Sequence, residues 1–394
     1  MLSLTVVLFL SQDAPGKRHL ILPADVPPPY HTPSRGKQAS FIRGKGDAPL
    51  KAPPGFRIQV FARGLRSPRN LYALPNGDLL VTESYQHRIR LLRDSDGDGR
   101  AETTTVFASG LRLPYGIALR GDWLYVANTD SLVRFRYTPG ALKAGAKEAL
   151  VRGIPSKGWR QHWTRNIAFS PDGSKLYLSV GSESNKSPEA PPRATIQEYD
   201  TTTWRPRTFA TGLRNPVGLA FRPGTGDLWT TCVERDYMGD HFPPEFVTRV
   251  RQGDFFGWPW YAVGNRLDPQ LARRNPPKKP VAMPDVLLPA HSVPLGLVFY
   301  QGSLFPSSYH GDAFVALKGG RNSLERHGYK VVRIRFEDGK LVHGFEDFIT
   351  GWLPSPRSNS VWGQPVGLAV GRWGELFISD ETGHKVWRVT FGRG

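Results

Sequence analysis

The 394-residue sequence predicts an all-β protein, a six-bladed β-propeller made of four-stranded antiparallel blades. The first indication is a phrase that recurs along the chain: GLRNPVGLAF at 212–221 is echoed by GLRLPYGIAL at 110–119, GLRSPRNLYAL at 64–74 and GQPVGLAV at 363–370. The second is composition, because Gly 42 and Pro 35 indicate many turns. The third is that no long stretch keeps apolar residues at helical spacing without interruption by Gly or Pro.

Each recurrence opens a meander of short strands. Turn sequences such as PNGD at 75–78 tolerate positive φ, and apolar runs such as LYVA at 124–127 suit strands covered on both faces. One such sheet cannot bury both of its faces alone, so the copies must stack on each other. The six copies run over 70–94, 115–137, 166–185 with 195–200, 217–236, 295–320 with 329–336, and 366–391.

The spacing of the copies favours a propeller over a linear solenoid. The first four copies begin roughly 50 residues apart, which is close to the period of a propeller blade. The two longer intervals that follow indicate insertions in blades four and five. A linear stack is the alternative, but it needs capping repeats that the sequence does not show. In a propeller, the Gly-Leu-Arg-x-Pro turn leads the innermost strand of a blade toward the axis.

Outside the repeats, residues 1–50 are predicted to form a leader and an irregular N-terminal arm, and residues 51–394 a single propeller domain. The segment 1–16 has a short apolar core with no positive charge before it, so it resembles an atypical export signal and is too short for a membrane span. We therefore expect a periplasmic or secreted protein without an integral membrane segment. The single cysteine, Cys232, excludes an intramolecular disulfide and is expected to be a buried, inert thiol.

The chain is strongly basic, with a formal net charge of +18. Its Lys and Arg residues are scattered rather than clustered, and no nucleic-acid-binding motif is present, so nucleic acid is not an expected partner. The charge indicates a surface that attracts anions, or a basic interior for an anionic cofactor. The absence of a Rossmann fingerprint, a phosphate-binding Gly loop or a GxSxG motif disfavours nicotinamide, ATP and serine-hydrolase chemistry.

Chemistry is expected where the copies differ, first of all in GWRQHWTRNIAF at 158–169. His162 precedes an inner strand and should lie at the axial mouth, where an imidazole can accept a proton from a substrate hydroxyl near neutral pH. The alternative is a histidine held by a loop hydrogen bond. Nearby Arg165 and Asn166 favour the functional interpretation, with Arg165 as a candidate cofactor contact.

Further candidates for ligand binding lie in two other blades. Arg214 offers a planar fork to carboxylates or quinone oxygens, and Asn215 adds a neutral donor. Arg66 and Arg112 stand at the position of Arg214 in other copies, so the arginine is partly a feature of the repeat. Asn215 is therefore the more informative residue about function. Lys318 follows the apolar strand AFVAL and precedes two glycines, so it is expected to face an anionic ligand at the centre.

Two segments are candidate metal sites. DSDGDG at 94–99 places Asp94, Asp96 and Asp98 at alternate positions, as in the first half of a calcium loop, although position 105 is Thr instead of the bidentate Glu. VERDYMGDHFPPEF at 233–246 is an oxygen-rich insertion in blade four. For both segments, a solvated acidic loop without metal is the alternative.

Taken in order, several motifs resemble the glucose/sorbosone dehydrogenase family, whose members are quinoproteins that bind pyrroloquinoline quinone (PQQ) on a six-bladed propeller. The motifs are HWTRNIAFSPDG, GLRNPVGLAF, ERD…GD…GWP, GYKVVRI and VWGQPVGLAV…VWRV. The resemblance covers about residues 50–391 and is greatest to the sorbosone-dehydrogenase-like branch. It implies a PQQ- and Ca²⁺-dependent enzyme that oxidises an aldose or a related aldehyde or alcohol and passes the electrons to an acceptor that the sequence does not identify.

The resemblance also implies roles for individual residues. His162 matches the general base, while Arg214, Asn215 and Lys318 match cofactor contacts. The carbonyls around Arg235 and Asp236 match a calcium site beside PQQ, and Glu245 with the Phe256 carbonyl resembles a second calcium site.

Two positions depart from the family pattern. Gln364 stands in a cofactor-contact slot where relatives often have Arg, and Gln161 stands where the family has an aspartate beside the base. These departures keep open a non-catalytic propeller that serves as a binding platform. A lactonase-like metal hydrolase is a further alternative, but it needs acidic residues along the axis, and the starts of the inner strands offer Asn, Tyr and Gly.

Overall fold

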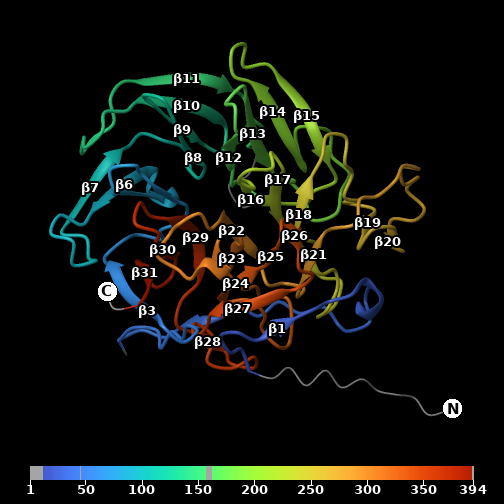
Figure 1. The fold of residues 1–394 in the computed structure, drawn as a ribbon. Coiled ribbons are helices and arrows are strands. Elements are labelled where there is room, and N and C mark those ends of the chain that lie inside the picture. The colour runs from blue at the N-terminus through green and yellow to red at the C-terminus, as the bar shows by residue number, and fades with distance from the viewer. Residues whose placement is uncertain (1–11, 45, 157–161, 393–394) are drawn as a thin grey trace.

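The computed structural model describes residues 12–44, 46–156 and 162–392. The predicted six-bladed propeller is confirmed, because six antiparallel sheets are arranged in sequence around a common axis (Figure 1). Within the described residues, the only helical elements are three short 3₁₀ turns: η1 (Pro23–Asp25), η2 (Ser84–Gln86) and η3 (Ser307–Tyr309).

Blades one to three each contain four strands, ordered from the axis outward. Blade one is β4 (Leu71–Ala73), β5 (Leu79–Glu83), β6 (Arg88–Arg93) and β7 (Thr103–Ala108). Blade two is β8 (Ile117–Arg120), β9 (Trp123–Ala127), β10 (Ser131–Arg136) and β11 (Lys147–Arg152). Blade three is β12 (Ile167–Phe169), β13 (Lys175–Val180), β14 (Thr195–Asp200) and β15 (Pro206–Thr211).

Blades four to six repeat the pattern with additions. Blade four is β16 (Pro216–Phe221), β17 (Leu228–Cys232), β18 (Glu245–Val250) and β21 (Val286–Leu288). Blade five is β22 (Pro294–Phe299), β23 (Ala313–Leu317), β24 (Lys330–Ile334) and β27 (Phe345–Ile349), with β1 (Arg18–His19) on its edge. Blade six is β29 (Pro365–Val370), β30 (Leu376–Asp380), β31 (Lys385–Phe391) and β3 (Phe56–Ala62). The insertions add the hairpins β19 (Tyr261–Ala262) with β20 (Arg266–Leu267) and β25 (Phe336–Glu337) with β26 (Lys340–Leu341).

The ring closes by joining the two ends of the propeller sequence in one blade. Strand β3, from the start of the propeller sequence, pairs antiparallel with β31, from its end, and forms the outer strand of blade six (Figure 1). The repeat pattern did not predict this pairing, because β3 precedes the first copy and carries none of its motifs. The closure leaves no open end to the ring, so it explains why no capping repeat is present.

The hydrophobic core lies between the blades as six clusters, one for each pair of neighbours. In β9, for example, Leu124 and Val126 pack toward blade one, whereas Tyr125 and Ala127 pack toward blade three. The two-residue period of a strand places successive side chains on opposite faces, which is why these strands are apolar on both.

Close packing of the inner strands explains the glycine in the repeated phrase. A Cβ on Gly218 would lie 2.6 Å from the Leu295 carbonyl oxygen of the next blade, and one on Gly367 would lie 2.2 Å from the Arg69 carbonyl oxygen. Neither position leaves room for a side chain. The repeated sequence therefore encodes the packing of blade against blade.

The N-terminal arm, expected to be irregular, is largely without regular structure but is attached to the propeller. Strand β1 pairs with β27, and β2 (Ser40–Phe41) pairs in parallel with β28 (Ser360–Val361). Between these strands, the Tyr30 amide donates to the Met238 carbonyl at 2.7 Å, and the Lys37 amide donates to the Arg321 carbonyl at 2.9 Å. The arm therefore runs past the insertion of blade four and a loop of blade five.

Blade topology divides the loops between two rims of the ring. One edge of the ring is formed by the loops that precede the first strand of each blade and by the loops that join its second strand to its third. We call this edge the site rim. The turns between first and second strands, and between third and fourth strands, form the opposite rim. All candidate ligand-binding positions except the 94–99 loop and Phe256 lie in, or border, loops of the site rim. Among the described residues, we find no helix that is both long and apolar enough to cross a membrane.

Candidate functional site

His162 lies on the site rim, in the loop that leads into β12. Its Nδ1 lies 3.1 Å from both the carbonyl oxygen and the Oγ of Ser182, which belongs to the loop after β13. Burial lowers the pKa of His162 well below its usual value, and the positive charge of Arg214 lowers it further. The imidazole is therefore neutral at pH 7. When Nδ1–H donates to the Ser182 carbonyl, Nε2 carries the lone pair that can accept a proton.

Arg165 holds the loop of His162 in place. Its fully buried guanidinium donates to the carbonyl oxygens of His162 at 2.7 Å, Thr164 at 2.8 Å and Pro155 at 2.7 Å. Burial, together with the nearby charge of Arg193, lowers the pKa of Arg165 to about 9. These contacts direct its Nη atoms at the chain itself, so the structure gives Arg165 a supporting position under the loop. Gln161 lies outside the described residues.

Asn215 is brought directly beside His162 by the glycine between them. A Cβ on Gly181 would lie 2.5 Å from His162 Cβ and 2.6 Å from Asn215 Oδ1, so both side chains press on this position. Asn215 is 8% exposed, and its Oδ1 has no hydrogen-bond partner within the described protein. Three loops from blades three and four therefore converge here.

Arg214 links this group to the insertion of blade four. Its Nη1 donates to the Glu234 carbonyl oxygen at 2.5 Å, and its Nη2 lies 3.0 Å from both Asn185 Oδ1 and Asp236 Oδ2. The Ser182 amide donates to the Arg214 carbonyl at 2.7 Å, which connects Arg214 to the residue that holds His162.

At the predicted calcium site at 235–236, the oxygen atoms of Asp236 accept hydrogen bonds from other residues. Asp236 accepts Arg214 on one carboxylate oxygen and Asn322 on the other, while its main-chain oxygen accepts Asn185 Nδ2 at 3.0 Å. Arg235 is buried in an ion pair with Asp268. The Asp236 carboxylate is thus neutralised by a protein cation and an amide, and calcium at the carbonyls of 235–236 stays a prediction.

Glu245 and Phe256, the residues of the predicted second calcium site, each have partners of their own. Glu245, at the start of β18, accepts the Ser292 hydroxyl at 3.1 Å and the Val293 amide. Burial raises the pKa of Glu245 well above its usual value, which favours the protonated carboxyl. The Phe256 amide donates to Thr211, and its ring stacks on Phe246, with no hydrogen bond to Glu245 among the described contacts. Calcium at this place stays a prediction.

Lys318 lies in the loop after β23 and shares an acid with a residue that the sequence did not single out. Its Nζ lies 2.8 Å from Glu381 Oε2, and Arg69 Nη1 lies 2.8 Å from the same oxygen. Although burial alone would raise it, these two cations lower the pKa of Glu381 to about 2. Gln364 borders the same group, because its carbonyl accepts the Glu381 amide at 2.9 Å.

A small apolar cluster on the axis forms the floor of the site. We define this axial floor by Tyr115, Val217, Val233, Leu295 and Val366, against which Trp163 and Val293 pack. Four of these are the residues that follow the proline at the start of an inner strand. The equivalent residue of blade one is Arg69. A comparison of this position between copies could have shown from sequence alone that only Arg69 and Arg165 are charged there, without showing which acid Arg69 contacts.

The polar atoms around the floor fit a flat anionic ligand. Several polar atoms of the site are buried without a partner within the described protein, among them the donors Arg69 Nε and Arg214 Nε, the Tyr115 hydroxyl and the acceptor Asn215 Oδ1. Each such group costs about 1–3 kcal/mol when it stays unpaired. With Arg214 and Lys318 nearby, the donor set is cationic above an apolar floor, as a planar polycarboxylate requires.

The acidic loop at 94–99 is separate from this site, between β6 and β7. The carboxylates of Asp94, Asp96 and Asp98 lie together with that of Glu102, with their ligand atoms all within 4.8 Å of one another. Glu102 was not predicted, because the expected acid was sought at position 105. All but Asp94 are exposed, and exposed acidic groups of this kind are common without an ion. Metal binding here stays a prediction.

The fold and the candidate site together define this protein as a six-bladed propeller with a histidine and several cations on one rim. A family model for TrAA12-like proteins matches residues 50–241 and 272–391. The chain belongs to the TrAA12-like family, and this membership confirms the kinship with PQQ-dependent sugar dehydrogenases that the sequence motifs indicated.

Known proteins share the fold over most of the chain. The iodide structure of the Trichoderma reesei protein of carbohydrate-active enzyme family AA12 has a TM-score of 0.75 and 19% identity, covering 89% of this chain and 99% of that one. The holo form of the pyranose dehydrogenase PQQ domain from Coprinopsis cinerea has a TM-score of 0.72 and 20% identity, covering 89% and 100%. An uncharacterised protein of Borreliella burgdorferi is 24% identical over 354 residues, 87% of this chain and 91% of that protein.

Proposed function

We propose that this protein is an oxidoreductase that removes a hydride and a proton from an aldose, or from a related sugar aldehyde or alcohol, with PQQ as its cofactor. The observation that supports this most strongly is the placement of His162 beside Arg214 and Asn215 above the axial floor. Relatives in fold include a PQQ domain of a pyranose dehydrogenase, which agrees with this substrate class.

The residues at the axial mouth would have different roles in cofactor binding and proton transfer. Arg214, Asn215 and Lys318 would hold the cofactor, with Gln364 at its edge, and Arg165 would keep the loop of His162 in position. When bound, the quinone supplies a two-electron acceptor. His162 Nε2 would take the proton of the substrate hydroxyl, since Nδ1 is tied to Ser182. The Ser182 carbonyl would stabilise the imidazolium that forms, in place of a carboxylate partner.

The alternatives that the sequence left open differ in what the axis must offer. A lactonase-like hydrolase needs acidic ligands at the starts of the inner strands, where the described residues place Arg69, Tyr115, Arg165, Val217, Leu295 and Val366. We therefore set it aside. A non-catalytic platform shares the same fold and differs only in turnover.

Reconstitution tests the proposal. The purified protein is incubated with PQQ, with and without Ca²⁺, and dye reduction is measured with a panel of aldoses, sugar aldehydes and alcohols. Turnover that requires PQQ supports the enzyme. PQQ uptake without turnover of any panel member would support the binding platform, and absence of uptake would reject the cofactor. The Ca²⁺ arm tests the predicted dependence on that ion, and the natural electron acceptor stays to be identified.

The proposed export is tested separately. A periplasmic or secreted location is suggested by the apolar start of the chain, of which residues 1–11 lie outside the described part. Cell fractionation of the full chain and of a chain lacking residues 1–16 would show whether this segment directs export.

A further inference from the structure

Arg69, Glu381 and Lys318 form a largely buried group, which we call the triad. Arg69 precedes β4 in blade one, Glu381 follows β30 in blade six, and Lys318 follows β23 in blade five. Both cations contact the same carboxylate oxygen, Oε2, at 2.8 Å. The side chains of Arg69 and Glu381 are 6% and 7% exposed, whereas that of Lys318 is 23% exposed.

The charges of this triad do not cancel. Glu381 carries one negative charge, because the two cations keep its pKa at about 2. Burial alone would lower the pKa of Arg69, but Glu381 outweighs that effect and the pKa is raised. Burial lowers the pKa of Lys318, while Glu381 acts to raise it. When Lys318 is protonated, the triad keeps a net positive charge around the largely buried Arg69 and Glu381. A buried charge without a partner is costly, so this arrangement favours the binding of an anion.

Arg69 also has unused donor capacity and a fixed orientation. Its Nε is buried without a hydrogen-bond partner in the described protein. Its guanidinium lies 5.1 Å from the ring centre of Trp163 and 5.8 Å from that of Tyr115. Trp163 is the neighbour of His162 in sequence, so Arg69 connects the triad to the loop of the proposed base. The flat ion is thereby fixed between two rings of the floor region.

We propose that Arg69 and Lys318, held in place by Glu381, form a seat for a carboxylate group at the axial mouth. Arg69 is thus a binding residue in its own right. The seat rests on the proposed function for its preferred occupant, a carboxylate of the quinone cofactor. The same chemistry would accept the carboxylate of an acidic sugar such as a uronate.

The test compares Arg69→Gln with Arg66→Gln. Arg66 belongs to the same turn and carries the same charge, but its side chain is exposed. Binding of PQQ is measured by fluorescence titration, and binding of D-glucuronate against D-glucose by thermal shift, without any assay of turnover. We expect Arg69→Gln to weaken binding of one carboxylate ligand about 10- to 100-fold, the loss typical of one charge-assisted hydrogen bond, with Arg66→Gln unchanged. Arg69→Lys keeps the charge in case the glutamine variant does not fold, and should lose less.

The outcomes separate the seat from the proposed function. Weakened PQQ binding identifies the cofactor as the occupant, and weakened glucuronate binding with normal PQQ binding identifies the substrate. A parent protein that binds glucuronate through Arg69 but never PQQ would reject the proposed cofactor and keep the seat. If folded Arg69 variants bind both probes as the parent does, or if the parent binds neither, the seat does not exist.

Discussion

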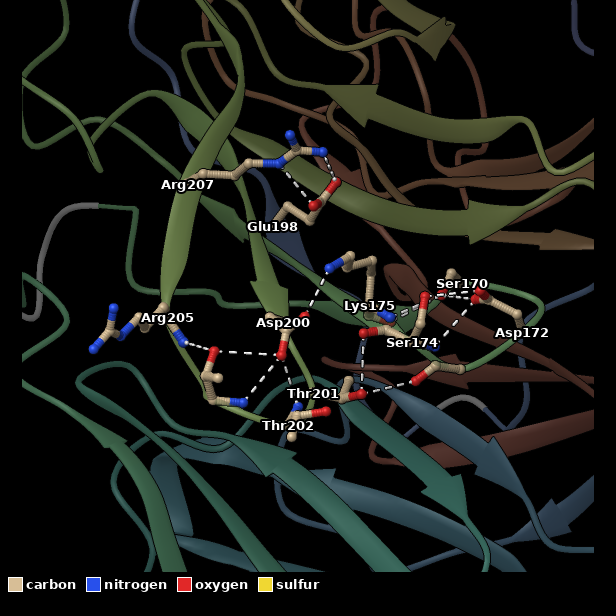
Figure 2. A network of polar contacts seen from close by, with 12 residues as sticks. Ser170, Asp172, Ser174, Lys175, Glu198, Asp200, Thr201, Thr202, Arg205 and Arg207 are labelled. Carbon is tan, nitrogen blue, oxygen red and sulfur yellow. Dashed lines mark hydrogen bonds and ion pairs between the residues drawn. The ribbon is translucent and has the colours of Figure 1, made fainter.

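The opposite rim of blade three and the site rim at blades three and four show how the same scaffold treats polar groups differently. On the opposite rim, Asp172 and Asp200 form a network in which nearly every acceptor is met by a donor from the same turns (Figure 2). Glu198 is likewise held by both nitrogen arms of Arg207, at 2.7 and 3.0 Å. On the site rim, Asn215 Oδ1 and Glu234 Oε2 are buried without partners.

The difference follows from where the partners come from. Asp200 receives Lys175 at 2.8 Å and the amides of Thr202 and Thr203 at 3.0 Å, all from its own blade. His162 and Asn215 instead meet across loops of different blades. The polar groups of a turn find hydrogen-bond partners within the same turn. Where loops of several blades meet, some polar groups keep no protein partner and can bind a ligand. We therefore expect substitutions on the two rims to affect different properties.

The largest effect is expected from His162→Gln. This change removes the proposed proton acceptor and should lower the turnover number of the PQQ-loaded protein about 10²- to 10⁴-fold, the usual contribution of a general base. Because the pKa of His162 is lowered, the parent should stay active down to pH 6.5 and lose activity only below it. The measurement is the pH profile of dye reduction for both proteins. A variant with the parent's rate and acid limb would show that His162 is not the base.

A smaller loss is expected from Gly181→Ala. The new Cβ would lie within 2.6 Å of both the His162 side chain and Asn215 Oδ1, so both must move. A displacement of about 1 Å at a reacting group can cost up to about 10²-fold in rate, and we expect about 10- to 100-fold here. Gly36→Ala is the matched control, because its Cβ would meet only Tyr237 at 3.8 Å. Equal rates for the two variants would show that the packing of His162 against Asn215 is unimportant.

The sequence predicted the propeller fold better than it predicted the contacts of the candidate site. The glycines and apolar strands of each copy report the contact of neighbouring blades, which every blade repeats. The closing strand β3 was missed because it is an outer strand, and outer strands lack the repeated phrase. Arg69 and Glu381 were missed because their pairing joins blades one and six, which only ring closure brings together.

Residue type alone also could not tell which arginines bond their own loop and which reach another blade. Arg165 and Arg69 occupy the same slot in blades three and one, just before the first residue that contacts the next blade. Arg165 bonds three carbonyls of its own loop, whereas Arg69 reaches an acid of another blade. That distinction depends on the path of the preceding loop, which no local pattern encodes.

A third effect is expected on stability from Glu234→Gln. Burial raises the pKa of Glu234 to about 7 against an ordinary value of 4.5, although Arg214 and Arg235 act to lower it. The folded state therefore keeps a proton that the unfolded state releases, and the parent loses stability as pH rises between these values. The loss amounts to at most about 3 kcal/mol, since one pKa unit corresponds to about 1.4 kcal/mol. The variant should lack this loss.

Denaturant unfolding at pH 5 and pH 8 measures the difference. The exposed Glu148 provides the control substitution Glu148→Gln, which should change the free energy of unfolding by the same amount at both pH values. If the parent is equally stable at the two pH values relative to Glu234→Gln, then Glu234 is ionised in the folded state and has a partner on the site rim.

The smallest effect is expected on the opposite rim, from Asp200→Asn. The amide keeps an acceptor for Thr202 and Thr203 but gives up the charge that pairs with Lys175. Because Lys175 and these amides hold the pKa of Asp200 below its usual value, the pair stabilises the fold above about pH 4 and this stabilisation disappears as the pH falls further. Melting temperature should therefore fall by no more than a few degrees at pH 7, and by progressively less as the pH falls below about 4. PQQ binding and dye reduction should equal those of the parent, since the hydrogen bonds of this network among the described residues stay within blade three. A loss of activity as large as that of Gly181→Ala would mean that the rims are coupled through β13, and the separation of roles between them would be wrong.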